Sequence, residues 1–216
     1  MIRILIADDH AIVREGLKQI LLGAEDFQVA GEASNGLEAL DQIRKDEWDV
    51  IVLDMSMPGR SGIELIKQIH EEKPKLRILV LTMHGEEQYA ARAFKSGAAG
   101  YLTKESAPAE LVSAVRKVAS GGMYVSTAMA EKLAFGLTPK ADELPHERLS
   151  NREFDVFRRI AAGQSVSEIA EQLSVSIKTI STHKTRILQK MQMQNNAELI
   201  RYAITHKLID DLDTPT

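Results

Sequence analysis

The 216-residue sequence contains no cysteine, so neither a disulfide framework nor a cysteine-based metal site can form. The absence of cysteine suits a reducing compartment, and we expect a cytoplasmic protein. We also expect no targeting segment. The first residues, Met1 to Asp9, are a short apolar run that ends in two acids, and no basic stretch precedes it. This start predicts a β-strand, and neither a signal peptide nor a membrane span.

Acidic residues are absent from one region near the C-terminal end. The whole chain carries 27 Lys and Arg against 31 Asp and Glu, a formal net charge of −4. Residues 172–197 nevertheless contain Lys178, Lys184, Arg186 and Lys190 and no acid. An exposed helix face usually mixes both signs, so we expect an anionic partner here. The alternative is an ordinary solvated face.

A chain of this length is expected to form two domains, because single domains usually contain about 100 to 150 residues. In the first 120 residues, short β-rich runs alternate with helical patterns whose apolar residues recur every three or four positions. The β-rich runs are Ile2–Ala7, Gln28–Ala33, Val50–Asp54, Ile78–Thr82 and Gly100–Thr103. Strict alternation predicts a parallel sheet covered by helices on both faces, with ligands beyond the carboxyl ends of the strands.

The pattern changes after residue 122. We predict a first domain over residues 1–122 and a linker over residues 123–147, with a short helix at Thr127 to Phe135. Residues 148–212 have helical periodicity throughout and are predicted to form a small all-α domain.

Several helix ends are marked by local signals. Ser106 is expected to cap a helix that has Pro108 in its first turn. Gly163 suits a left-handed helix end, and Ser165 and Ser176 are expected to cap the two helices that follow. Two short helices joined by a tight turn at this spacing form a helix-turn-helix.

Polar side chains stand at the ends of the predicted strands. Asp8 and Asp9 follow the first strand, Asp54 and Thr82 end the third and fourth, and Lys104 follows the fifth. Three carboxylates at one sheet edge repel one another unless a proton or a cation intervenes, and oxygen ligands of this kind suit Mg²⁺. An acidic turn without metal is the alternative for the Asp pair alone. The added hydroxyl and ammonium favour a phosphoryl-transfer site.

With these residues and the stretch Asp54-Met55-Ser56-Met57-Pro58-Gly59, roughly residues 1–122 resemble the receiver domain of response regulators. The resemblance implies a doubly wound, five-stranded parallel sheet with the flavodoxin-like order 2-1-3-4-5. It also implies that Asp54 accepts the phosphoryl group, and that Asp8, Asp9, Asp54 and the backbone carbonyl of Ser56 hold Mg²⁺.

The same resemblance gives roles to three further residues. Lys104 would pair with the phosphoryl oxygens, Thr82 would move toward them, and Tyr101 would turn inward behind Thr82; a buried core tyrosine is the alternative for Tyr101. Two departures from the family are visible. Glu105 stands where a proline usually follows the lysine, which leaves the isomer of that peptide bond open, and Ser56 replaces a common asparagine, which leaves the phosphoryl lifetime open.

The third predicted helix of the C-terminal domain separates apolar from polar residues. Its expected apolar side consists of Ile177, Ile180, Ile187, Leu188 and Met191. A polar, acid-free face suits a groove lined by phosphates and base edges. The residues expected to contact DNA are Lys178, Thr179, Ser181, Thr182, Lys184, Thr185 and Lys190.

The stretch from Leu149 to Glu153, Glu168-Ile169-Ala170 and the stretch from Lys178 to His183 resemble the LuxR-type helix-turn-helix. Joined to a receiver, it is similar to the NarL/FixJ class of regulators. This resemblance implies a phosphorylation-dependent transcription regulator of a two-component system. Its partners would be a sensor histidine kinase, double-stranded DNA and a second copy of the chain on DNA.

Two features limit what can be carried over from the relatives. Many of them have lysine at the position of Ser181, so the base preference is not transferred. His183 is expected to make a packing or phosphate contact rather than to bind metal, because no second ligand stands at metal spacing.

Two other functional classes compete with a regulator. A phosphatase or mutase would use Asp54 as a covalent carrier, but no second carboxylate stands two residues later and no large cap domain is present. We therefore expect no turnover of a separate substrate. A protein-interaction module with a vestigial DNA face is the third class, and salt-dependent DNA binding would distinguish it.

Overall fold

The protein is described by a computed structural model that covers residues 1–57, 62–83, 87–126, 129–130, 144–206 and 208–209. The chain divides into two compact units, Met1–Leu137 and Thr138–Thr216. The short helix predicted at Thr127 to Phe135 falls almost entirely outside the described residues. No helix in the described part of the chain has both the length and the apolar character that a membrane crossing requires.

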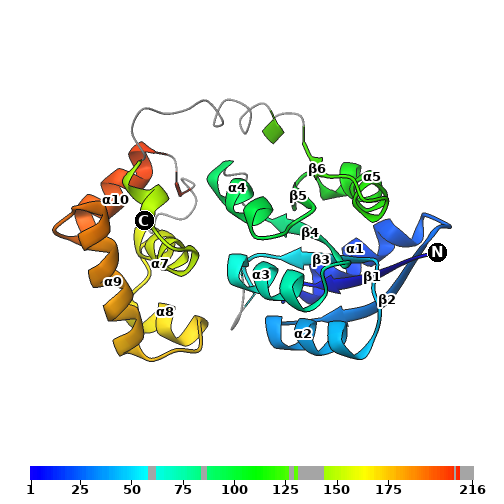
Figure 1. The fold of residues 1–216 in the computed structure, drawn as a ribbon, viewed down its shortest axis with the longest axis horizontal. Coiled ribbons are helices and arrows are strands. Elements are labelled where there is room, and N and C mark those ends of the chain that lie inside the picture. Colours follow the sequence, from blue (N-terminus) through cyan, green and yellow to red (C-terminus); the bar gives the residue numbers. More distant parts are fainter. Residues whose placement is uncertain (58–61, 84–86, 127–128, 131–143, 207, 210–216) are drawn as a thin grey trace. The chain divides into compact units, whose positions relative to one another are not determined.

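The first unit contains a parallel sheet with the strand order β2-β1-β3-β4-β5-β6 (Figure 1). Its strands are β1 Ile2–Ala7, β2 Phe27–Ala33, β3 Val50–Asp54, β4 Arg77–Thr82, β5 Gly100–Thr103 and β6 Tyr124–Val125. The predicted order of the first five strands is confirmed. The sixth strand differs from the prediction, because sequence analysis places Tyr124 and Val125 in the linker. Two residues are too few to show a strand period, and β6 is recognised only by its pairing with β5.

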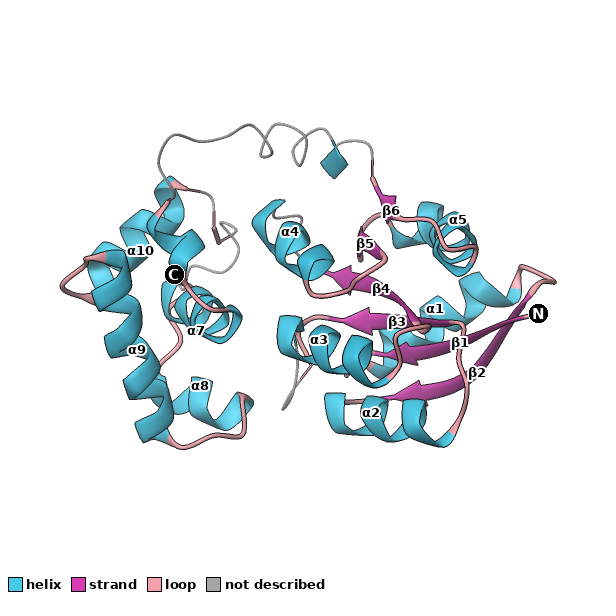
Figure 2. Ribbon diagram, in the orientation of Figure 1, coloured by secondary structure: helices cyan, strands magenta, loops and turns pink. Residues whose placement is uncertain are grey.

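Helices cover both faces of this sheet (Figure 2). One face carries α1 (Ala11–Leu22) and α5 (Ala107–Ala119), whose apolar residues pack on β1, β3 and β4 in one core. The other face carries α2 (Gly36–Lys45), α3 (Gly62–Glu72) and α4 (Glu87–Lys95). All five residues of β3 are buried, as expected for a central strand with helices on both faces.

The start of α5 differs from the prediction. Ser106 precedes the helix but its side chain makes no capping hydrogen bond. The Ser106 hydroxyl instead lies 3.0 Å from the Thr103 hydroxyl and donates to the Thr103 carbonyl at 3.2 Å, so the preceding turn competes for the capping group. The peptide bond between Lys104 and Glu105 is trans, as are all others in the described residues.

In its described residues, the second unit contains helices and no strand. Its elements are the 3₁₀ turn η1 Pro145–Arg148 and the helices α7 Asn151–Ala161, α8 Val166–Gln172, α9 Ile177–Met191 and α10 Asn196–Thr205. The core contains Phe154, Phe157, Ile180, Ile187 and Leu199, all fully or almost fully buried. Helices α7 and α9 pack on each other, as do α7 and α10 and the pair α8 and α9. This compact bundle fixes the orientation of α9.

Each of the four helices in this unit begins at a serine or asparagine. The side chains of Ser150, Ser165, Ser176 and Asn195 accept a hydrogen bond from the backbone N–H three residues later. Gly163 follows α7 with a φ of 84°, the left-handed conformation in which glycine has no Cβ penalty. The expected caps at Ser165 and Ser176 are therefore present.

Candidate functional site

The strand register brings the predicted polar residues of the first unit to one edge of the sheet. Ala7 pairs with Leu53, so the next residues, Asp8 and Asp54, lie side by side at the ends of β1 and β3. Thr82 pairs with Thr103, which places Lys104 directly beyond β5. The backbone N–H of Lys104 also donates to the Thr82 carbonyl at 2.7 Å. Five positions scattered over about one hundred residues thus form one cluster.

Lys104 lies between two buried carboxylates. Its Nζ is 2.7 Å from Asp8 Oδ2 and 3.2 Å from Asp54 Oδ2, and its side chain is only 10% exposed. Asp8 and Asp54 are buried as well. The Lys104 ammonium therefore compensates part of the negative charge that the ends of β1 and β3 concentrate here.

Burial raises the pKa of Asp54 above its ordinary value, and the nearby Asp8 carboxylate acts in the same direction. The Lys104 ammonium opposes this shift without overcoming it. Burial alone would lower the pKa of Lys104, but its hydrogen bond and charge interactions with Asp8 and Asp54 outweigh burial and raise that pKa. Lys104 is thus held as a cation, but its single positive charge does not balance the carboxylates around it.

The donor set fits a divalent cation. One ligand atom from each of Asp8, Asp9, His10 and Asp54 lies within 4.8 Å of the others. Asp54 Oδ1 is buried and lacks a hydrogen-bond donor, and Asp9 Oδ1 is buried with His10 Nδ1 at 2.9 Å. Buried carboxylate oxygens without donors are stabilised by a cation. The structure describes Ser56 in the loop directly after β3, two residues beyond Asp54.

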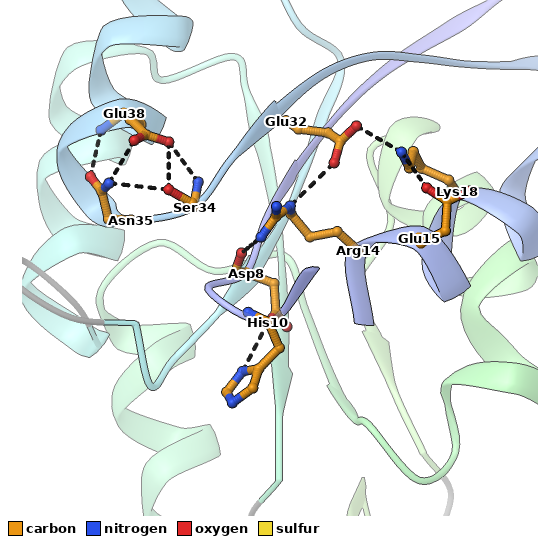
Figure 3. A network of polar contacts seen from close by, with 9 residues as sticks. All are labelled: Asp8, His10, Arg14, Glu15, Lys18, Glu32, Ser34, Asn35 and Glu38. Carbon is orange, nitrogen blue, oxygen red and sulfur yellow. Dashed lines mark hydrogen bonds and ion pairs between the residues drawn. The ribbon is translucent and has the colours of Figure 1, made fainter. Parts of the chain in front are cut away.

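A polar network holds the loop that carries the Asp pair (Figure 3). The Arg14 guanidinium donates to the Asp8 carbonyl at 2.7 Å and to Glu32 Oε2 at 3.2 Å. Lys18 binds the other Glu32 oxygen at 2.9 Å and Glu15 at 2.6 Å. Helix α1 and strand β2 are thereby joined beside the site, and the Asp8 carbonyl has a fixed direction.

Thr82 and Tyr101 are both buried, and each lies on one of the paired strands β4 and β5. Tyr101 therefore points into the unit rather than into solvent. This placement agrees with an inward tyrosine, and equally with a core tyrosine, so the switch role of these two residues stays a prediction.

Helix α9 presents most of its expected polar face to solvent. Lys178, Thr179, Ser181, Thr182 and Thr185 are exposed, and Lys184 is half-buried. The Thr182 hydroxyl donates to the Lys178 carbonyl at 2.9 Å, and the Thr185 hydroxyl donates to the Ser181 carbonyl at 3.1 Å. Both hydroxyl oxygens keep a lone pair for an outside donor, and both threonine methyl groups can meet an apolar partner.

One residue of α9 differs from the sequence-based assignment, and a second has a partner that sequence analysis did not foresee. Ile177 was expected on the apolar side but is 56% exposed, because it occupies the first helical position, where the chain enters from the turn. Lys190 was grouped with the exposed cations. Its Nζ lies 2.6 Å from Oε2 of Glu153, a buried carboxylate that also caps α7 through the Ser150 N–H. Lys190 therefore joins α9 to α7.

Comparison with known proteins decides the family. Residues 4–116 match the response regulator receiver domain, and residues 147–203 match the luxR family of bacterial regulatory proteins. The chain is a response regulator. Its domain composition places it in the NarL/FixJ class.

Similar response regulators share nearly the full length of this one. Response regulator UvrY of Escherichia coli K12 is 40% identical over 209 residues, which are 96% of each chain. The oxygen regulatory protein NreC of Staphylococcus carnosus is 39% identical, over 96% of this chain and 99% of its own. A solved structure of RcsB from Salmonella typhimurium has a TM-score of 0.74 at 31% identity, over 94% of this chain and 97% of RcsB. An RcsB–DNA complex matches with a TM-score of 0.60 at 31% identity, over 94% of this response regulator and 98% of that chain.

Sequence analysis missed three residues that the structure places at these sites. His10 and Arg14 contact the Asp8–Asp9 loop, and Glu153 binds Lys190. Adjacency to the Asp pair was a signal for His10. For Glu153 the signal was weaker, because its partner lies 37 residues away and only the packing of α7 on α9 brings the two together.

Proposed function

We propose that this response regulator is switched by transfer of a phosphoryl group to Asp54 and that the switch controls DNA binding by the second unit. The observation that carries the proposal is the buried Asp54 carboxylate, with one oxygen on Lys104 and the other without a donor. A carboxylate in this state is a nucleophile that its surroundings do not neutralise. The donor would be a sensor histidine kinase, and the setting would be the cytoplasm.

The transfer is a displacement at phosphorus. An Asp54 oxygen forms a bond to phosphorus while the bond between phosphorus and the donor breaks, and the donor leaves with the electron pair of that bond. Lys104 leaves the two carboxylates and pairs with the phosphoryl oxygens, and the Thr82 hydroxyl donates to one of them. Asp8, Asp9, Asp54 and the Ser56 carbonyl would hold Mg²⁺, which supplies positive charge to the transferred group. No turnover of a separate substrate is part of this proposal.

On DNA, Lys178 and Lys184 would contact phosphates, whereas Ser181, Thr182 and Thr185 would approach base edges. The hydroxyl of Thr179 is engaged at the start of α9, 2.8 Å from that of Ser176, so its contact would be limited to the backbone of the duplex. Lys190 would contribute less to DNA affinity than the other lysines, because Glu153 already binds its ammonium. In α10, Leu199 and Ala203 are buried while Ile204 is 51% exposed. This leaves apolar surface for a second copy, so two half-sites on DNA are expected.

The test uses Asp54→Asn, which keeps the shape of the side chain and removes the nucleophile. The full chain is incubated with Mg²⁺ and labelled small-molecule phosphoryl donor, and bound label and DNA affinity are both measured. We expect the variant to take up no label and to show no donor-dependent gain in DNA affinity. Asp41→Asn is the control, because Asp41 is exposed on α2 and its one ion pair within the described residues is with Arg44 at 3.7 Å. Labelling of the Asp54→Asn chain at the wild-type level would overturn the proposal.

A further inference from the structure

We propose that His10 gives the acidic site a nitrogen ligand, which raises the affinity of the site for later divalent transition-metal ions such as Co²⁺ relative to its affinity for Mg²⁺. The inference rests on the proposed function, because the same carboxylates serve both ions. It concerns a residue that the phosphoryl-transfer chemistry does not use.

His10 is held with its ring against the Asp pair. Its backbone N–H donates to Asp8 Oδ1 at 2.8 Å, which anchors the residue at the start of α1. Its Nδ1 lies 2.9 Å from Asp9 Oδ1 and 3.3 Å from Asp8 Oδ1. The ring is seen beside Asp8 in Figure 3. At these separations the ring nitrogen either donates a hydrogen bond to the carboxylate oxygens through Nδ1–H or shares a metal ion with them.

The separations suit a metal ion. Bonds from such an ion to histidine nitrogen and carboxylate oxygen are about 2.1 Å long, so two ligand atoms at a right angle lie about 3 Å apart. The His10 side chain is 64% exposed, which leaves an entry path from solvent. It makes no capping hydrogen bond to α1, so it is free to serve as a ligand without loss of helix structure.

The remaining ligand would come from Asp54. Lys104 binds the Oδ2 atoms of Asp8 and Asp54, whereas Asp8 Oδ1 lies on the His10 side. Asp54 Oδ1 is buried and lacks a hydrogen-bond donor, and it belongs to the same 4.8 Å group of ligand-bearing residues. Lys104 and the His10 imidazole thus contact different carboxylate oxygens of the cluster.

The chemistry of the imidazole determines which ions benefit. Mg²⁺ prefers oxygen ligands and retains water, whereas histidine nitrogen suits the later first-row ions. A transition-metal ion bound by His10, Asp9 and Asp54 would compete with Mg²⁺ for the two carboxylates.

The experiment titrates tag-free full-length protein with Co²⁺ and follows the visible absorption of the bound ion, with Mg²⁺ affinity measured in parallel by calorimetry. His10→Ala should weaken Co²⁺ binding about tenfold or more and change Mg²⁺ affinity less than about twofold. His70→Ala, at an exposed histidine of α3, is the matched control and should leave both affinities unchanged.

Equal Co²⁺ affinity in wild type and His10→Ala would overturn the inference. Equal losses for Co²⁺ and Mg²⁺ would overturn it too, because His10 would then only position the loop. Neither titration contains a phosphoryl donor, so failure of the proposed function is seen separately in the labelling of Asp54. Co²⁺ binding through His10 in a chain that takes up no label would contradict the proposed function alone.

Discussion

In the unphosphorylated chain, the Lys104 ammonium lies between the carboxylates of Asp8 and Asp54. A more highly charged group could also occupy this place. The two Lys104 contacts of 2.7 and 3.2 Å join carboxylates at the ends of neighbouring strands. Under the proposed function, a phosphoryl group on Asp54 would give the same ammonium a stronger partner and draw it away from at least one carboxylate. Lys104 alone would then make the unphosphorylated and phosphorylated arrangements mutually exclusive, as a two-state switch requires.

Thr82→Ala should still allow Asp54 to accept a phosphoryl group but should remove the gain in DNA affinity that follows. The nucleophile and Lys104 remain, so the variant should still be labelled in the presence of Mg²⁺. It lacks the hydroxyl that senses the phosphoryl oxygen, so the phosphorylation-dependent gain in DNA affinity, expected at about fivefold or more in wild type, should be lost. Label uptake and DNA affinity are measured on the same samples.

Thr103→Ala is the control for this prediction, because Thr103 pairs with Thr82 in the sheet but directs its hydroxyl to Ser106. A Thr82→Ala chain that is labelled and also gains DNA affinity as wild type does would contradict the switch role of Thr82.

At this scale, sequence analysis could place Asp8, Asp54, Thr82 and Lys104 together because each stands at a strand end, and parallel strands end at one edge. The direction of the His10 ring was beyond reach. It depends on the backbone hydrogen bond to Asp8, which is a property of the folded loop. The two roles open to Tyr101 were likewise not separated by burial alone.

Helix α7 and helix α9 are joined by the Glu153–Lys190 pair, and this contact should make the second unit sensitive to acid. Burial acts to raise the pKa of Glu153, but hydrogen bonds from Lys190 and from the Ser150 N–H outweigh it and hold the pKa below its ordinary value. A lowered pKa in the folded state contributes stability that is complete above the ordinary glutamate pKa and is lost as the pH falls through the folded value.

Glu153→Gln should therefore lower the free energy of unfolding by about 1.5 to 3 kcal/mol at pH 7. The difference from wild type should shrink as the pH falls below about 4.3. Urea unfolding of the full chain, followed at several pH values, measures both effects.

Glu168→Gln is the matched control, because Glu168 occupies the corresponding position of α8, caps Ser165 and has no lysine partner among the described contacts. Its effect at pH 7 should be smaller. A difference between wild type and Glu153→Gln that stays constant from pH 7 to pH 3.5 would contradict the role given to the ion pair.

On helix α9, positively charged and hydroxyl side chains should respond differently to substitution. If Lys184 contacts a phosphate as proposed, Lys184→Ala should weaken binding to all duplexes and reduce the salt slope by roughly one. If Thr182 contacts a base edge as proposed, Thr182→Ala should cost about 1 to 3 kcal/mol, mainly on the preferred sequence. Titrations on specific and scrambled duplexes at several salt concentrations separate the two.

The reverse result would exchange these roles. If Thr182→Ala weakened both duplexes equally and Lys184→Ala spared the scrambled one, the threonine would contact the backbone and the lysine a base.

Sequence patterns located most elements because buried apolar runs and helical periodicity are local. The first five strands begin within one residue of their predicted starts. Strand β6 was missed because pairing, not periodicity, creates it. The Ser106 cap was wrong because Thr103 offers the serine hydroxyl a nearer partner. The Lys190 assignment rested on its charge alone, and the α7–α9 packing was needed to find its partner.

The two units have separate cores, so the full-length protein should respond to ligands unit by unit. Mg²⁺ with beryllium fluoride as a phosphoryl mimic should raise the melting temperature of the receiver transition by stabilising only its folded state. A duplex with two half-sites should raise that of the second transition. Differential scanning calorimetry measures both, and Asp54→Asn should remove the first shift while it leaves the second. A single transition that moves as a whole with either ligand would contradict independent units.

The serine and asparagine N-caps of the second unit also bear on how fast each unit folds during synthesis. Each helix of the second unit has its starting signal within four residues of sequence, from Ser150 to Glu153 in the first case and from Asn195 to Glu198 in the last. The receiver must instead bring together segments as distant as Arg3 and Asp49 before its central strands are paired. Folding rates fall as the sequence separation of contacts grows. The receiver leaves the ribosome first, yet the helix-turn-helix, once released, should complete its fold in less time.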